Sequence, residues 1–97
     1  MATKKVRYNK KADAYVVKTQ DASGQSPCIY EVTLAHGDLA IPHGMVTKYD
    51  HRQLYHTYRF SPGHSADKNH AICIGTSVSL QEAIDDVRQA WLVGAIK

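Results

Sequence analysis

The last quarter of the chain constrains the fold most, because an apolar segment there is followed at once by an amphipathic one with a helix-start signal. Residues 70–77 (HAICIGTS) are mainly small or β-branched, which predicts a buried strand. Ser79 stands three residues before Glu82, the spacing of a reciprocal capping pair at a helix N-terminus. A helix is therefore predicted from Ser79 to about Val93, ended by Gly94.

The predicted helix has one apolar stripe, which should face a hydrophobic core. Apolar residues recur along it at spacings of three and four positions, the period of one helix face. Glu82, Asp85 and Asp86 stand toward its N-terminal end, where the helix dipole favours negative charge. The stripe consists of Leu80, Ala83, Ile84, Val87, Ala90 and Trp91.

Alternating polar and apolar residues fill much of the rest of the chain, interrupted by segments rich in Gly, Pro, Asp and Ser. The alternation is typical of half-buried strands and the interruptions are typical of loops. Strands are predicted over residues 5–9, 14–19, 28–35, 45–60 and 70–77, with a short apolar piece at 39–41 and loops at 20–27 and 61–69. Because the connections are short, neighbouring strands should be antiparallel. We therefore predict one α+β domain over residues 1–97, a mostly antiparallel sheet of about five strands with one C-terminal helix packed on one face.

The predicted core joins the apolar face of each strand to the apolar stripe of the helix. In the third strand Cys28, Tyr30, Val32 and Leu34 point to the same side, because side chains alternate along a strand. We expect Trp91 to be largely buried beneath the helix. The predicted core residues are Val6, Tyr8, Val17, Tyr30, Val32, Leu34, Leu54, Tyr58, Phe60, Ile72, Ile74, Leu80, Ile84, Val87 and Trp91.

One helix is too small to cover such a sheet. A helix of this length measures about 22 Å by ~10 Å, whereas five strands span roughly 24 Å. Either the sheet curls around the helix, or its remaining surface meets a partner. Self-association is therefore an expectation that the sequence itself raises.

The predicted long strand 45–60 carries the most distinctive surface, because alternate residues place aromatic, amide and cationic groups in one row. Such a row is compatible with a solvated face, with a protein contact, or with stacking on nucleic-acid bases, where Lys5 and Arg7 would add phosphate contacts. The row consists of Tyr49, His51, Gln53, Tyr55, Thr57 and Arg59. We predict a non-catalytic interaction module that binds a protein partner or itself through this face. Nucleic-acid binding through the same face and the basic N-terminal strand is the alternative.

The charge of the chain compels neither a nucleic-acid nor an anionic-membrane partner. The formal net charge is only +3. Half of the Lys and Arg residues nevertheless lie near the N-terminus, where they are also compatible with a protected edge strand. These residues are Lys4, Lys5, Arg7, Lys10, Lys11 and Lys18.

No arrangement for catalysis, metal binding or cofactor binding stands out. Cys28 and Cys73 lie in apolar strand-like segments, where a thiol is usually buried and inert. Among the six histidines, His36 and His43 occupy neighbouring turns and with Asp38 would supply three metal ligands at most. The simpler interpretation is that they are turn and surface residues. We predict no metal or cofactor, and an enzymatic function is not favoured.

The sequence also lacks targeting and membrane features. No apolar segment approaches the ~20 residues of a membrane-spanning helix, and none follows the N-terminal MATKK. The two cysteines do not define a disulfide framework. We therefore expect a cytoplasmic protein without a membrane partner.

Residues 71–90 (AICIGTSVSLQEAIDDVRQA) are similar in arrangement to the end of HicB-type antitoxin domains and of the arm-binding domains of some phage integrases. In both, a strand is followed by a Ser or Thr cap and by Glu-Ala early in a helix. The resemblance covers about twenty residues, and the upstream segment departs from both patterns with a longer insertion before the last strand. It implies a small sheet-plus-helix module and carries no functional residue to this chain.

Overall fold

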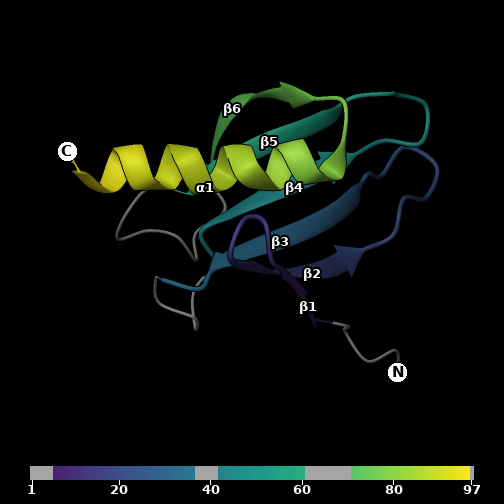
Figure 1. The fold of residues 1–97 in the computed structure, drawn as a ribbon. Helices are drawn as coiled ribbons and strands as arrows, with labels where there is room; N and C mark the ends of the chain where they lie inside the picture. Colours follow the sequence, from purple (N-terminus) through teal and green to yellow (C-terminus); the bar gives the residue numbers. More distant parts are fainter. Residues whose placement is uncertain (1–5, 37–41, 61–70, 97) are drawn as a thin grey trace.

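Six strands and one helix make up the described part of the chain (Figure 1). The computed structural model describes residues 6–36, 42–60 and 71–96, and only the backbone of residues 94–96. The elements are β1 (Val6–Asn9), β2 (Ala14–Gln20), β3 (Cys28–Leu34), β4 (Gly44–Lys48), β5 (Tyr55–Phe60), β6 (Ala71–Ser77) and α1 (Leu80–Ile96). The strands form one antiparallel sheet in the order β1-β2-β3-β4-β5-β6. The predicted α+β fold is confirmed, with six strands instead of about five. The predicted segments 39–41 and 61–69 lie outside the described residues.

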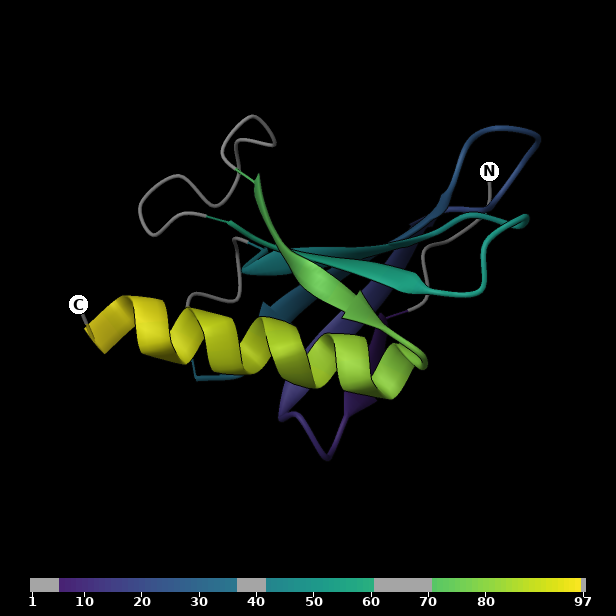
Figure 2. The same ribbon diagram turned by 90° about the horizontal axis from the view of Figure 1, so that it is seen from above.

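The strand register defines the two faces of the sheet, because directly opposed residues in neighbouring strands point to the same side. On the helix-facing side, Val16 opposes Val32 and Val32 opposes Gly44, which lies against the α1 residue Val87. The other side is called the open face here. One row across the open face consists of Val6, Val17, Glu31, Met45 and Tyr58. Figure 2 shows α1 running along one side of the sheet, with no second helix on the other side among the described residues.

Helix α1 begins where the sequence predicts. The backbone N–H of Glu82 donates to the Ser79 hydroxyl oxygen at 3.2 Å, and the N–H of Ala83 donates to the Ser79 carbonyl oxygen at 3.1 Å. Ser79 is therefore the N-cap residue. The predicted end is wrong, because the helix continues through Gly94 to Ile96. A glycine inside a helix weakens it by about 1 kcal/mol, which is too little to end it.

Side-chain hydrogen bonds fix α1 to strands at both ends of the sheet. The Ser77 hydroxyl group on β6 donates to a carboxylate oxygen of Asp86 at 2.7 Å. The side-chain amides of Asn9 on β1 and Gln81 on α1 exchange two hydrogen bonds, at 2.7 and 3.0 Å. The Asn9 side-chain oxygen also accepts the Ala12 backbone N–H at 2.9 Å, so the same residue closes the β1–β2 turn. Together these bonds attach α1 to both edge strands of the sheet.

The core lies between α1 and the helix-facing side. Val32, Val46 and Val87 are fully buried at its centre. Of the predicted core residues, Val32, Leu34, Ile84 and Val87 are buried in this core. Phe60 is also buried, but alternation along β5 places it on the same face as Tyr58, away from α1. Tyr30, Leu80 and Trp91 are half-buried and pack against the cluster, so the prediction of a largely buried Trp91 is only partly met.

Four predicted core residues are exposed, three on edge strands and one in a loop. Val6 and Tyr8 on the edge strand β1 are 60% and 51% exposed. Ile72 on the other edge strand, β6, is 42% exposed, and Leu54 in the loop before β5 is 41% exposed. Val17, Tyr58 and Ile74 are half-buried. An edge strand has one neighbour only, so the apolar pattern of a strand does not by itself place its residues in a core.

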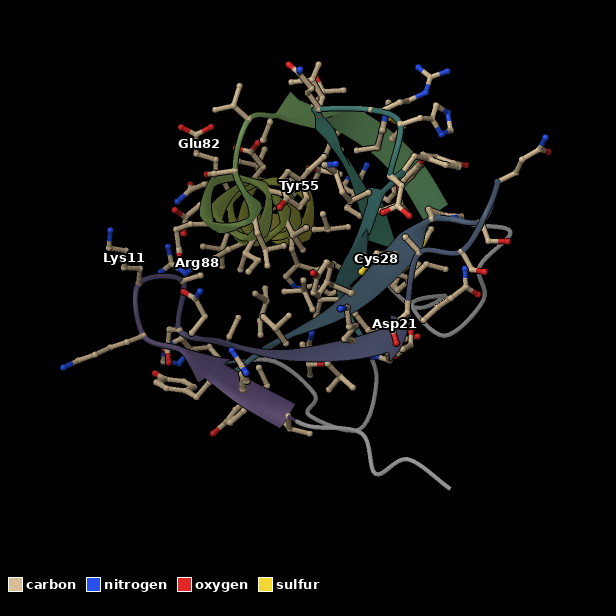
Figure 3. The ribbon with its side chains drawn as sticks, turned by 90° about the vertical axis from the view of Figure 1, so that its right-hand side faces the viewer. Lys11, Asp21, Cys28, Tyr55, Glu82 and Arg88 are labelled. Atoms are coloured by element: carbon tan, nitrogen blue, oxygen red, sulfur yellow. The ribbon has the colours of Figure 1, made fainter. Side chains whose placement is uncertain are left out.

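The prediction of one long strand over residues 45–60 is wrong. The segment forms two antiparallel strands, β4 and β5, joined by a loop at residues 49–54. The loop changes the alternation, so that Tyr55 and Thr57 fall on the helix-facing side. Tyr55 packs against the core between the sheet and α1 (Figure 3). Thr57 is fully buried.

The C-terminal strand is an edge rather than a buried strand. Among the described strands β6 pairs with β5 alone, and Cys73 is exposed, against the prediction of a buried thiol. The ladder between the two strands shifts register, because Gly75 opposes Thr57 whereas Cys73 opposes the next residue of β5. Ile74 is the extra residue of this bulge. Gly75 has a φ of +143°, a backbone conformation that other residues rarely adopt.

Candidate binding cleft on the open face

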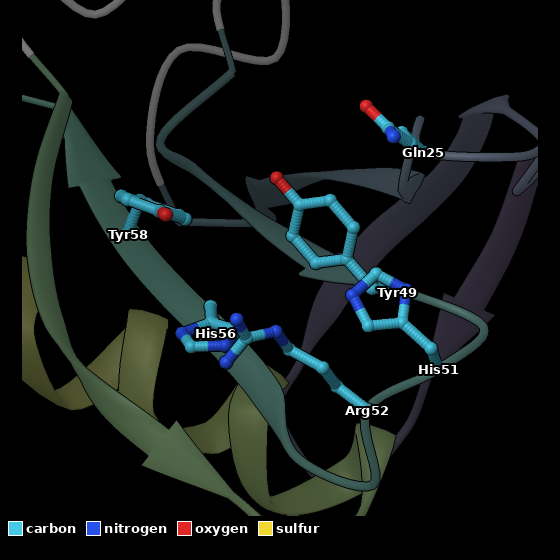
Figure 4. Close-up of a pocket in the computed structure, with 6 residues that line it drawn as sticks. All are labelled: Gln25, Tyr49, His51, Arg52, His56 and Tyr58. Carbon is cyan, nitrogen blue, oxygen red and sulfur yellow. The ribbon is translucent and has the colours of Figure 1, made fainter.

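An open cleft of about 670 Å³ lies at the end of the sheet where β4 and β5 are joined. His56 and Tyr58 contribute from β5, where the register places them on the open face. Figure 4 shows the side chains around the cleft. Its lining residues are Gln25, Tyr49, His51, Arg52, His56 and Tyr58. The cleft therefore combines one strand with two loops.

The loop that carries half of the lining residues is held in shape by Lys48. The Lys48 ammonium group donates to the backbone carbonyl oxygen of Tyr49 at 3.0 Å and to that of Arg52. The backbone N–H of Arg52 donates to the Tyr49 carbonyl oxygen at 3.2 Å, which closes a turn. The same ammonium group lies 5.8 Å from the centre of the Tyr55 ring, a cation–π contact. The cleft-lining side chains of this loop are thus attached to an ordered turn.

Aromatic rings form much of the cleft surface. The rings of Tyr49 and His51 have their centres 5.5 Å apart and their planes at 56°. Tyr58 and His56 are half-buried on β5, so part of each side chain remains accessible. Planar rings offer flat apolar faces, and their hydroxyl and ring nitrogen atoms also form hydrogen bonds.

Gln25 reaches the cleft from the β2–β3 loop. Ser23 and Ser26 exchange backbone hydrogen bonds at 3.0 and 2.8 Å, which places Gln25 in a tight turn. Gly24 in this turn has a φ of +58°, a conformation that glycine adopts without steric strain. The Gln20 side-chain amide donates to the Pro27 carbonyl oxygen at 2.7 Å and closes the base of the loop.

The charge of the cleft is one-sided. None of its six lining residues is Asp or Glu, and Arg52 supplies the single guanidinium group. Arg52 is exposed and so remains available to a ligand. A guanidinium group forms paired hydrogen bonds with a carboxylate or a phosphate. The arrangement therefore favours a ligand that carries a negative charge next to a flat group.

The structure brings together only two of the predicted binding residues. Tyr49 and His51 line the cleft, although in a loop instead of a strand. Gln53 is exposed in the same loop and does not line it. The prediction that these residues share one row with Tyr55 and Arg59 is wrong, because the register of β5 turns the latter two toward the helix-facing side.

The basic N-terminal residues do not join the open face in the described part of the chain. Arg7 opposes Val16 and therefore points to the helix-facing side. Lys5 lies outside the described residues. That the predicted residues bind a partner remains a prediction.

Sequence reasoning missed four lining residues: Gln25, Arg52, His56 and Tyr58. Tyr58 was assigned to the core because it follows Leu54 and His56 at strand spacing, but the loop before β5 reverses that assignment. The signal that could have found the turn is Asp50, since Asp is frequent in turns. Gln25 lies far from the others in sequence, so its place in the cleft depends on the strand order.

The histidines considered as metal ligands do not converge. His36 is exposed and forms an ion pair with Asp13 when protonated. His43 is buried, and its ring contacts the Trp91 ring edge-on at 4.7 Å, so its assignment to a surface turn is wrong. Asp38 lies outside the described residues. Among the residues that the structure describes, no group of three His, Cys, Asp or Glu side chains could hold a metal ion.

The two cysteine thiols are not bonded to each other. Cys28 is buried in β3 and Cys73 is exposed on β6. Within the described ranges, no helix has the length and apolar character needed to cross a membrane.

Comparison with known proteins adds no relative. No protein-family model matches the chain, no curated protein is significantly similar to it, and no solved structure matches its fold significantly. The function must therefore be argued from the chain itself.

Proposed function

We propose that this protein is a non-catalytic interaction module that binds an acidic segment of a partner protein in the cleft of the open face. The observation that carries the proposal is the make-up of the cleft, where Arg52 and the rings of Tyr49 and Tyr58 lie together without a carboxylate. Tyrosine and arginine are among the side chains enriched at protein contacts, because each combines apolar area with strong hydrogen bonding. A glutamate or aspartate side chain of the partner would pair with the guanidinium group.

The position of the cleft supports a protein segment as the ligand. It is open and lies beside a sheet face on which Met45 and Tyr58 are direct neighbours and remain partly accessible, with Glu31 on the next strand, β3. A peptide lying along this face would cover apolar side chains and place its acidic group at Arg52. The ordered turn at Lys48 lowers the entropy lost on binding, because the loop is already held in one conformation.

Nucleic-acid binding is the second candidate, favoured by the flat rings beside a guanidinium group. Phosphate binding normally combines several Lys and Arg contacts, and the cleft contains Arg52 alone. Arg7, which was expected to add a phosphate contact, points to the helix-facing side. The single cation therefore favours the protein ligand.

The test is a titration of isotope-labelled protein, in which NMR measures the chemical shifts of the backbone amides. The probes are a short peptide of Glu and Tyr, a peptide of equal length with Lys in place of Glu, and a single-stranded oligonucleotide. We expect shifts around residues 49–58 with the acidic peptide only. Arg52→Ala should weaken that binding by about tenfold or more, because a charged hydrogen-bonded pair is lost.

Lys11→Ala is the matched control, since it removes the same charge from an exposed residue of the β1–β2 turn. Figure 3 shows Lys11 at the other end of the sheet from Asp21, which begins the loop of Gln25. Lys11→Ala should leave the affinity for the acidic peptide unchanged. If the oligonucleotide binds instead, with an affinity that falls steeply with salt, the nucleic-acid candidate replaces the protein one. An absence of shifts with all three probes refutes both.

A further inference from the structure

The two edges of the sheet differ in their protection against pairing with another chain. β1 has four residues, includes Arg7, and is followed by Lys10 and Lys11. β6 has seven residues and contains no charged residue and no proline. The chain carries no Asp, Glu, Lys or Arg between Lys68 and Glu82. Charged side chains, short length and β-bulges are among the usual means by which proteins prevent edge-to-edge association, and of these three β6 has only the bulge at Ile74.

β6 also exposes apolar side chains beside its unpaired edge. Ile72 is 42% exposed and Val78, directly after the strand, is 71% exposed. Leu54 is 41% exposed at the start of β5, next to the pair formed by Tyr55 and Ser77. Figure 1 shows β6 at the margin of the sheet, on the far side from β1. Within the described residues, no strand pairs with its outer side.

We propose that β6 pairs in antiparallel fashion with β6 of a second copy of this chain. Unpaired backbone N–H and C=O groups of a strand are satisfied best by another extended backbone, and β6 itself offers one. Antiparallel pairing of two identical strands is two-fold symmetric, so the contact closes at a dimer. Pairing of β6 with β1 of another copy would leave edges open and continue into a filament. The absence of charge allows two copies of β6 to approach without repulsion.

The bulge limits where the two strands meet. Ala71, Ile72 and Cys73 form one regular stretch of β6, and Gly75, Thr76 and Ser77 form the other, on either side of the extra residue Ile74. The first stretch carries the exposed apolar side chain of the strand, Ile72. A symmetry axis at Ile72 would place the two Ile72 side chains opposite each other and the exposed Cys73 of each copy beside Ala71 of the other. The sheet would then run continuously through both copies. No residue of β6 lines the cleft, so dimer formation and peptide binding can be measured independently.

Sedimentation equilibrium of the whole chain tests the proposal, together with Ile72→Lys and the control Val6→Lys. Both replacements introduce one positive charge at an exposed apolar residue of an edge strand. We expect the wild type and Val6→Lys to have the mass of a dimer and Ile72→Lys that of one chain, because like charges directly opposed across two strands repel. Within one copy Ile72 opposes Arg59 on β5, whereas Val6 opposes Val17. We expect circular dichroism spectra to be the same for all three proteins, which would show that Ile72→Lys changes the mass without unfolding the sheet.

A label on Cys73 provides a second measurement that needs no replacement on β6. Cys73 is exposed and Cys28 is buried, so a nitroxide reagent should modify Cys73 selectively. Paired strands lie about 5 Å apart, so two labels would come within roughly 20 Å, including their linkers. A wild-type mass of one chain overturns the proposal. So does a dimer that survives Ile72→Lys, since its interface must then lie elsewhere.

Discussion

Gly44 on β4 and Val87 on α1 approach so closely that a Cβ atom at Gly44 would lie 2.5 Å from a Val87 methyl carbon. The same Cβ atom would lie 2.5 Å from the backbone carbonyl oxygen of Tyr58 on β5. Val87 is fully buried in the core, so its side chain has little room to move. The helix can therefore lie close to the sheet only because Gly44 has no side chain.

Gly44→Ala should destabilise the protein by about 1–3 kcal/mol, the usual effect of overpacking a core. Val87→Ala in the same chain should recover only part of that loss, because the Tyr58 carbonyl oxygen belongs to the sheet backbone and cannot be shortened. Urea unfolding of both single variants and the double variant measures the coupling. Additive effects, with no coupling between the two sites, would contradict the close contact.

His43 continues the sheet beyond the start of β4. Its ring nitrogen Nδ1 accepts the Leu34 backbone N–H at 2.9 Å, and its own backbone bonds to Val32 and Phe60. Its ring also packs against Trp91. One buried side chain thus satisfies a strand-end N–H group and supports the C-terminal half of α1.

Two variants of His43 separate these roles. His43→Phe keeps a ring but leaves the Leu34 N–H without its acceptor, which should cost about 1–3 kcal/mol. His43→Asn keeps an acceptor near the Nδ1 position but loses the ring contact with Trp91. Only His43→Asn should change the Trp91 emission, which reports directly on the contact with the ring. Equal emission changes in both variants would show that the hydrogen bond and the ring contact are not separable.

The sequence predicted the elements that depend on local signals and failed where distant segments meet. The Ser79 cap and the alternation of β3 are local patterns, and both were read correctly. The loop at 49–54 lacks Gly and Pro, and part of its hydrogen bonding comes from the Lys48 side chain, so its turn was missed. β6 was predicted as buried because an apolar strand pattern does not say whether a strand is central or at an edge.

The candidate cleft was predictable only in part for the same reason. Tyr49 and His51 are predicted as members of an exposed row on a strand, and they line the cleft from a loop instead. The contribution of Gln25 depends on the β2–β3 loop bending toward β5, which no local pattern encodes. The face of Tyr58 depends on where β5 begins, and that position was set by the missed turn.

Thr57 contains a buried hydroxyl group without a hydrogen-bond partner among the described residues. It lies on the helix-facing side, opposite Val46 and Gly75. Thr57→Val replaces the hydroxyl by a methyl group of similar size and should stabilise the protein by about 1 kcal/mol. For a domain of this size that is a rise in melting temperature of roughly 4–8 °C.

Thr33→Val on the open face is the control for this replacement. Thr33 is only half-buried, so its hydroxyl group can bond to water and its removal should change stability by less than about 0.5 kcal/mol. Thermal unfolding followed by circular dichroism compares the two variants. A loss of stability on Thr57→Val would show that the hydroxyl group has a partner, such as a buried water molecule.

Tyr30 on β3 couples stability to alkaline pH. Burial, with a smaller contribution from the Cys28 side chain, raises the pKa of its phenol group from 10.0 to about 12. The folded state therefore binds the phenol proton more tightly than the unfolded state does. The resulting stability is fully present below about pH 10 and is lost as the pH rises through about 12. Tyr30→Phe has no such proton, so its free energy of unfolding should fall less over this window. Urea unfolding of both proteins at about pH 9 and about pH 11 measures the difference, and a difference independent of pH would contradict the raised pKa.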